Sequence, residues 1–353
     1  SIVEARVMMA PPDAEACVEI FSDPRVTAVA DNTEIFSGRR LLPRYLVMDP
    51  EERHVFIGYR FTHDTKRDSP SLLVVDLQTM ELRQADVENW ETVGMAWDPV
   101  EDATVAVMSY FEPFDKRAGN ARLVWMRRDG TITRDFTAQT PYRLDYYAVV
   151  HPTDEGIVIY GDQGDRQTYS RDGELLDHRV SAGLSGCSTY LNHHVIGDDR
   201  IVTSGGQGFV SDLMSADVAI VDIKRHEILH EAERRFDVAW GLDVDEPRAT
   251  IYAGSHDGYV TAYDMQLQMK RRIATGGMTA AVGVDPGRRL GYASTYYRGE
   301  LVAFHLDRGK ILGRVVVGRG SRALLALQDG TVLVGSGCGL MQVRPLDPVG
   351  HIK

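Results

Sequence analysis

LDVDEPRATIYAG, residues 242–254, joins an apolar strand-like segment to a second one, rich in β-branched and small residues, through an acidic turn that contains proline. The same pattern occurs six more times, at residues 45–58, 95–107, 148–160, 194–204, 282–294 and 324–335. Aligned on Asp49, Asp98, Pro152, Asp198, Asp245, Asp285 and Asp329, successive copies lie 40 to 54 residues apart. This spacing indicates a repeat protein whose units are each about the size of a four-stranded sheet.

The fifth copy shows what one unit contains. Four short strands are expected there, at residues 240–245, 250–254, 259–264 and 270–274, and they are rich in strand-forming residues. Seven such units predict an all-β, seven-bladed β-propeller of four-stranded antiparallel blades. The seventh copy ends near Val343 without an outer strand, so a strand within residues 26–36 is expected to complete it and close the ring.

Length and composition predict one domain over residues 1–353, in which residues 1–24 form an N-terminal extension with a short helix at 11–21. The net charge of −12 argues against a nucleic-acid or membrane partner, because both require dense positive surface. Cys17, Cys187 and Cys338 lack the spacing of a metal site and the density of a disulfide framework, which favours a cytoplasmic location. Ser1 is also compatible with a removed secretory signal.

The blade sequences resemble one propeller superfamily. DPGRRLGY at 285–292 and DGYVTAYD at 257–264 resemble the blade sequence pattern of the YVTN and quinoprotein amine dehydrogenase-like (lactonase-like) seven-bladed propellers. The chain lacks the Gly-His and Trp-Asp pairs of WD-repeat blades. The resemblance implies the propeller fold but no single activity, since its relatives by architecture include sugar lactonases, lyases, amine dehydrogenase large subunits and scaffolds.

Propellers of this kind usually bind ligands where the outer-to-inner and second-to-third strand loops surround the channel. Three of the second-to-third strand loops are long, at 62–71, 110–121 and 205–216, and long loops in compact repeats are often functional. The side chains expected at this mouth form two groups. The catalytic candidates are His63, Asp145, Tyr190, His193, Asp237 and His256, and the substrate-binding candidates are Arg44, Glu91, Arg143, Tyr146, Trp240, Tyr296, Arg298 and Arg322.

These residue types suit acid/base chemistry on a polar molecule. Histidines and carboxylates in a narrow channel can exchange protons, arginines can hold an anionic group, and aromatic rings can line an organic-ligand pocket. Ion pairing and packing between blades are the alternative for the same side chains. His63, His193 and His256 could also converge on a divalent metal, although no metal-type spacing is present and His-Asp-Gly is an ordinary turn. No other cofactor is expected.

Two functions therefore stay open. The first is a hydrolase, lyase or isomerase that acts on a small anionic or hydroxylated molecule at the channel mouth. The second is a noncatalytic binding or scaffold propeller with a protein partner. An enzyme should gather ionisable side chains at the mouth, whereas a scaffold should expose a continuous apolar patch.

Overall fold

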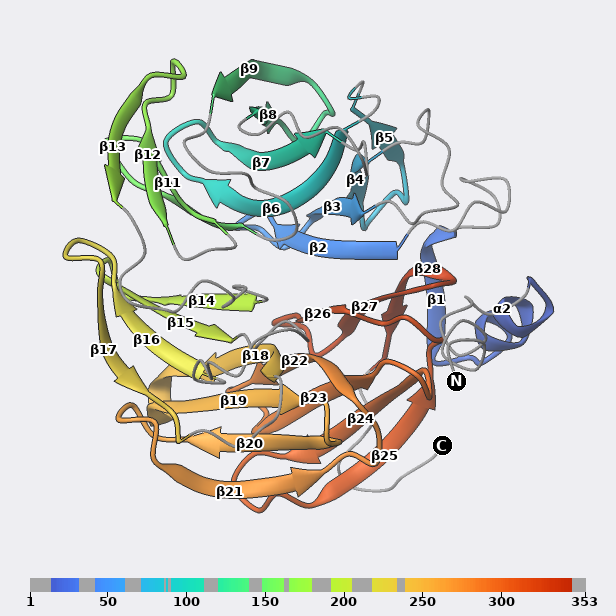
Figure 1. The fold of residues 1–353 in the computed structure, drawn as a ribbon. Helices are drawn as coiled ribbons and strands as arrows, with labels where there is room; N and C mark the ends of the chain where they lie inside the picture. Colours follow the sequence, from blue (N-terminus) through green and yellow to red (C-terminus); the bar gives the residue numbers. More distant parts are fainter. Residues whose placement is uncertain are drawn as a thin grey trace, which may run out of the picture. The chain divides into compact units, whose positions relative to one another are not determined.

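The computed structural model describes residues 14–31, 42–60, 71–85, 87, 90–110, 120–139, 148–161, 165–179, 192–204, 218–233 and 239–344. Within them the chain forms seven four-stranded antiparallel sheets, numbered here as blades 1 to 7 (Figure 1). The predicted fold class, an all-β, seven-bladed β-propeller, is confirmed. None of the helices in the described part is long and apolar enough to cross a membrane.

The chain divides into two compact units, residues 44–239 and residues 1–43 with 240–353. The prediction of a single domain stays a prediction.

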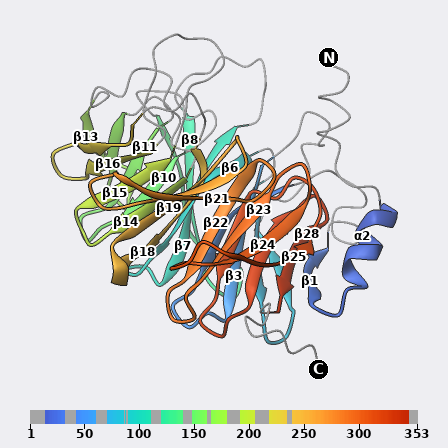
Figure 2. The same cartoon turned by 90° about the horizontal axis from the view of Figure 1, so that it is seen from below.

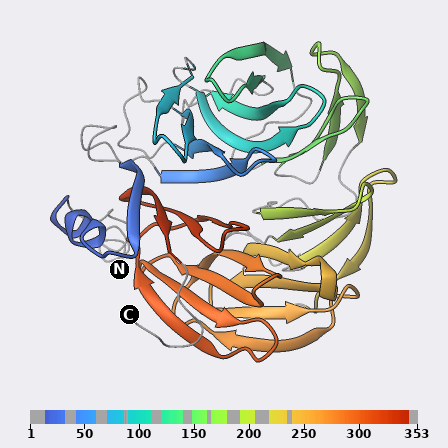
Figure 3. The ribbon, with the colours of Figure 1, turned by 180° about the vertical axis from the view of Figure 1, so that it is seen from behind.

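The first four blades are coloured blue to yellow in Figure 3. Blade 1 contains β2 (Leu42–Met48), β3 (His54–Arg60), β4 (Leu72–Asp76) and β5 (Leu82–Gln84), and blade 2 contains β6 (Trp90–Asp98), β7 (Ala103–Tyr110), β8 (Asn120–Met126) and β9 (Ile132–Gln139). Blade 3 contains β10 (Val149–Pro152), β11 (Ile157–Tyr160), β12 (Arg166–Tyr169) and β13 (Leu175–Arg179), and blade 4 contains β14 (Asn192–Ile196), β15 (Arg200–Ser204), β16 (Val218–Asp222) and β17 (Glu227–Glu231).

The remaining blades are orange and red in Figure 2, apart from one N-terminal strand. Blade 5 contains β18 (Ala239–Asp245), β19 (Thr250–Ser255), β20 (Tyr259–Tyr263) and β21 (Met269–Ala274), with the 3-10 turn η1 (Glu246–Arg248) after β18. Blade 6 contains β22 (Thr279–Asp285), β23 (Leu290–Thr295), β24 (Glu300–His305) and β25 (Ile311–Val316). Blade 7 contains β26 (Ala323–Ala326), β27 (Val332–Ser336), β28 (Gly339–Val343) and β1 (Val26–Asp31).

An N-terminal strand completes blade 7, as predicted. β1 pairs antiparallel with β28, from Val26 opposite Val343 to Asp31 opposite Gly339. This pairing covers the edge that β28 would otherwise expose. The predicted N-terminal helix is also present as α2 (Ala14–Phe21), next to β1 in Figure 1.

A disulfide bond joins this helix to blade 7. Cys17 in α2 is bonded to Cys338 in the β27–β28 hairpin, across 321 residues of sequence. Both cysteines are buried in a cluster with Ile20, Val317 and Met341. The number and spacing of the cysteines did not predict this bond. The two cysteines meet because β1 pairs with β28, and that pairing cannot be deduced from cysteine spacing.

Three of the acidic residues that mark the repeat, Asp49, Asp98 and Asp245, join neighbouring blades. Asp98 at the end of β6 is fully buried and accepts hydrogen bonds from Trp125 Nε1 and from the Arg171 guanidinium of blade 3, all within 3.0 Å. Arg128 of blade 2 reaches Asp49 of blade 1 in the same way, at 2.9 Å. Burial acts to raise the pKa of Asp98, but the bonds from Arg171 and Trp125 outweigh it and lower that pKa.

An ion pair also joins blades 5 and 6. Arg289 of blade 6 contacts Asp245 of blade 5 at 2.6 Å and Asp307 of its own blade at 2.6 Å. The turns after the first strands of blades 1, 2 and 5 therefore have a structural role, because their aspartates bind arginines of the next blade.

Candidate functional site

Six of the fourteen predicted site residues lie outside the described residues: His63, Asp145, Tyr190, Asp237, Arg143 and Tyr146. The other eight lie in both units of the chain. His193, Arg44 and Glu91 belong to residues 44–239, whereas Trp240, His256, Tyr296, Arg298 and Arg322 belong to residues 240–353.

Three of the predicted substrate-binding residues meet in one cluster. The guanidinium carbon of Arg322 lies 4.6 Å from the centre of the Trp240 ring and 4.7 Å from the centre of the Tyr296 ring. Trp240 belongs to β18 of blade 5, Tyr296 follows β23 of blade 6, and Arg322 precedes β26 of blade 7. Three successive blades thus contribute one side chain each, and the cation contacts two aromatic rings.

The surroundings of this cluster are apolar and ordered. Tyr296 packs with the buried residues Met278 and Ala280, and its ring meets Tyr297 edge to face, with centroids 4.9 Å apart. The backbone of Tyr296 is held at both sides, because its N–H donates to Met278 and its carbonyl accepts from Gly320. The rings beside Arg322 are therefore fixed by packing, as the walls of a preorganised site should be.

His256 and Arg298, also predicted from the loops of blades 5 and 6, are not the side chains that contact the Arg322 guanidinium through their rings. His256 is exposed in the β19–β20 hairpin. Arg298 is exposed and packs on the β21–β22 connection, where a Cβ added at Gly277 would lie 3.3 Å from its Cδ. A catalytic role for His256 and a substrate-binding role for Arg298 stay predictions.

Arg44 and Glu91 are buried at the starts of the inner strands of blades 1 and 2. Arg44 lies over the ring of Tyr45, with 5.6 Å between the guanidinium carbon and the ring centre. Their burial fits the packing alternative at least as well as ligand contact, and a substrate-binding role for either stays a prediction.

His193 lies on β14, the inner strand of blade 4, beside His194. Burial lowers the pKa of His193 to about 4, and the positive charges of His194 and His151 act in the same direction. His193 is therefore neutral at pH 7. His151 on β10 was missed by sequence reasoning, because the motif His-Pro-Thr was read only as the turn of the third repeat.

No group of three or more His, Cys, Asp or Glu side chains in the described residues is arranged to hold a metal ion. A metal at His63 stays a prediction, since that residue lies outside them.

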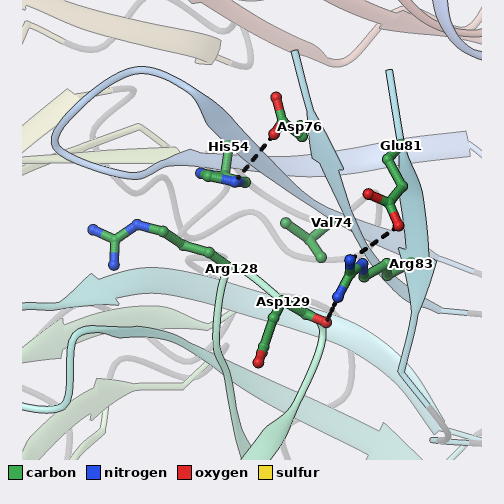
Figure 4. A pocket seen from close by; sticks show the side chains of 7 residues that line it. All are labelled: His54, Val74, Asp76, Glu81, Arg83, Arg128 and Asp129. Atoms are coloured by element: carbon green, nitrogen blue, oxygen red, sulfur yellow. Dashed lines mark hydrogen bonds and ion pairs between the residues drawn. The ribbon is translucent and has the colours of Figure 1, made fainter. Parts of the chain in front are cut away.

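A hollow of about 200 Å³ lies between blades 1 and 2 (Figure 4). It is lined by His54, Val74, Asp76, Glu81, Arg83, Arg128 and Asp129. Its charged groups are already paired. Arg83 contacts Glu81 at 2.9 Å and the Asp129 carbonyl at 2.7 Å, whereas Arg128 contacts Asp49, Glu51 and Asp102.

His54 in this hollow is oriented by two carboxylates. Its Nδ1 lies 2.8 Å from Asp49 and its Nε2 lies 3.7 Å from Asp76. Arg53 also pairs with Asp76, and the bonds from this arginine are the main reason why the pKa of Asp76 is lowered. A hollow whose ions already neutralise one another has little charge to offer a ligand, so we interpret it as part of the blade 1–blade 2 seam.

The comparisons with known proteins bear on the fold. No family model matches the sequence, and no curated protein matches it significantly. Among solved structures, a Kuenenia stuttgartiensis hydrazine synthase chain is similar with a TM-score of 0.66 and 11% identity, over 86% of this chain and 95% of that one. The Cps50 (Swd1) β-propeller domain of Myceliophteria thermophila is similar with a TM-score of 0.63, 11% identity and the same coverage. At this identity the likeness establishes a β-propeller fold and leaves the activity open.

Proposed function

We propose that this propeller binds a small anionic or hydroxylated molecule, and that Arg322 is the residue that holds it. The observation that carries the proposal is the contact of the Arg322 guanidinium with both aromatic rings, those of Trp240 and Tyr296. These side chains come from an inner strand and from loops at the blade end where we expect a ligand, away from the turns whose ion pairs join neighbouring blades.

The geometry favours an oxyanion over other ligands. The donors of a guanidinium lie in one plane and form a rigid fork. Such a fork matches the oxygen pair of a carboxylate or phosphate through two parallel hydrogen bonds, which a point charge such as an ammonium group does not provide. Because the rings are held by packing, little side-chain freedom is lost on binding, which increases affinity.

A thermal-shift screen of carboxylates and phosphates at constant ionic strength tests the proposal. The best ligand is then titrated by calorimetry against the parent, Arg322→Lys and Arg319→Lys. Arg319 is an exposed arginine of the same loop and serves as the matched control. Arg322→Lys keeps the charge but removes the planar fork, so its Kd should rise about tenfold or more, as expected for one charge-assisted contact. Equal Kd values for all three proteins would refute the role of Arg322.

Acid/base catalysis is a second candidate, and the neutral His193 beside His151 and His194 is the observation that favours it. A neutral imidazole can accept a proton from a bound substrate. A panel of lactones, esters and hydroxy acids would test it, with His193→Gln expected to abolish any turnover while leaving the Kd at Arg322 unchanged. Turnover that survives in His193→Gln would exclude His193 as the base.

The compartment is also a proposal. A buried disulfide fits an oxidising compartment better than a reducing cytoplasm, so we propose that the chain matures outside the cytoplasm. Free-thiol labelling of the protein from its native source should find Cys17 and Cys338 protected. If instead a protein partner binds and no small molecule does, the scaffold function replaces the proposal above.

A further inference from the structure

Blade 3 differs from the other blades in the third strand. The third strands of blades 1, 2 and 6 bury Val, Leu, Met, Trp or Phe side chains, whereas β12 reads RQTY. Asp165, directly before β12, and Gln167 and Tyr169 within it alternate along the chain and are 2%, 0% and 1% exposed. Gln167 lies opposite Ile159, and both Ile159 and Tyr169 belong to the apolar cluster between blades 2 and 3.

The three side chains form a directed hydrogen-bond chain. The Tyr169 hydroxyl donates to Gln167 Oε1 at 2.7 Å, and Gln167 Nε2 donates to Asp165 Oδ2 at 2.6 Å. Both bonds point toward Asp165, so the chain ends on the carboxylate. Burying these groups in an apolar seam is costly unless each one is satisfied.

Asp165 is not satisfied. Its second oxygen, Oδ1, is buried and has no hydrogen-bond partner. His178 Nε2 lies 3.9 Å from Oδ2, which is beyond hydrogen-bond distance. A buried carboxylate oxygen without a donor destabilises the fold, and polar groups that break the packing rules at such a cost are often retained because they serve a ligand.

We propose that Asp165 Oδ1 is the acceptor of a second binding site, which takes a positively charged group that donates an N–H bond. Arg166 and Thr168 lie on the opposite face of β12. Among the three side chains of the hydrogen-bond chain, Asp165 is therefore the one carboxylate. Gln167 and Tyr169 are positioning residues, because they hold the carboxylate without touching the ligand. This site is independent of the anion site at Arg322, which lies in the other unit of the chain.

The ammonium ion is the smallest probe of this chemistry. Potassium has a similar size and charge but donates no hydrogen bond, and tetramethylammonium carries the charge on nitrogen without an N–H group. The experiment compares the melting temperature of the parent in ammonium, potassium and tetramethylammonium chloride at equal ionic strength. Ammonium alone should raise it, because only a ligand of the native state shifts the equilibrium.

Two variants test whether the rise in melting temperature in ammonium depends on Asp165. Asp165→Asn keeps the shape and the bond from Gln167 but removes the charge, so it should lose the ammonium shift, weaken ammonium binding about tenfold or more, and melt at or above the parent in potassium. Asp172→Asn, whose side chain is 86% exposed on the same blade, should behave as the parent. Equal shifts in ammonium and potassium for the parent would overturn the proposal, and so would an ammonium shift that persists in Asp165→Asn. The parent comparison decides the question even if Asp165→Asn fails to fold.

Discussion

Breaking the Cys17–Cys338 bond should destabilise the protein strongly, because the unfolded chain regains the conformational freedom that the bond removes. The bond closes a loop of 321 residues. The chain-entropy relation gives about 6 kcal/mol for a loop of that length. The melting entropy of a chain of 353 residues is about 0.7 kcal/mol per kelvin, so the melting temperature should fall by about 8 °C.

Calorimetry of Cys17→Ser/Cys338→Ser against the parent measures this shift, and Cys187→Ser is the matched control because Cys187 is not part of the bond. Adding a reductant should lower the melting temperature of the parent and of Cys187→Ser, and leave the double variant unchanged. A shift of less than about 2 °C would refute the reasoning, since it would mean that the bond restricts the unfolded chain far less than the chain-entropy relation requires.

Three further predictions concern the seams and the edge of blade 7. Asp98→Ala leaves Arg171 buried without its carboxylate and should lower the free energy of unfolding by about 3–5 kcal/mol in urea titrations, whereas Asp135→Ala, which breaks the more exposed pair with Arg122, should cost less than about 1 kcal/mol. The lowered pKa values of Asp49 and Asp98 mean that their contribution is complete above about pH 4 and is lost as the pH falls through the native pKa, so Asp98→Asn should flatten the acid side of the stability–pH curve. Deleting residues 1–31 should expose the β28 edge and cause association visible by light scattering; a monomer with a parent-like melt would contradict the closure.

The fold was predictable because its signals are local and repeated. The acidic turn after the inner strand marks the repeat in the sequence. In the structure, the aspartates of three of these turns, Asp49, Asp98 and Asp245, each bind an arginine of the next blade. The missing outer strand of the last repeat predicted β1 for the same reason, since an incomplete sheet requires a partner.

The site was less predictable because it depends on contacts between distant segments. Loop position predicted that Arg322, Trp240 and Tyr296 share one end of their blades, and the structure adds the stacking that no spacing encodes. Asp165 was missed, although a polar RQTY in place of an apolar third strand was a readable signal. The sequence could not predict that Cys17 pairs with Cys338, because 321 residues separate the two cysteines.

The binding of an anion by Arg322 is the central claim. A crystal structure of the protein with the best carboxylate or phosphate from the screen tests it most directly. The account predicts two ligand oxygens within about 3 Å of the Arg322 nitrogens, in the guanidinium plane at the edge of the Trp240 and Tyr296 rings. A ligand bound elsewhere, with the Arg322 edge in contact only with protein, would contradict it.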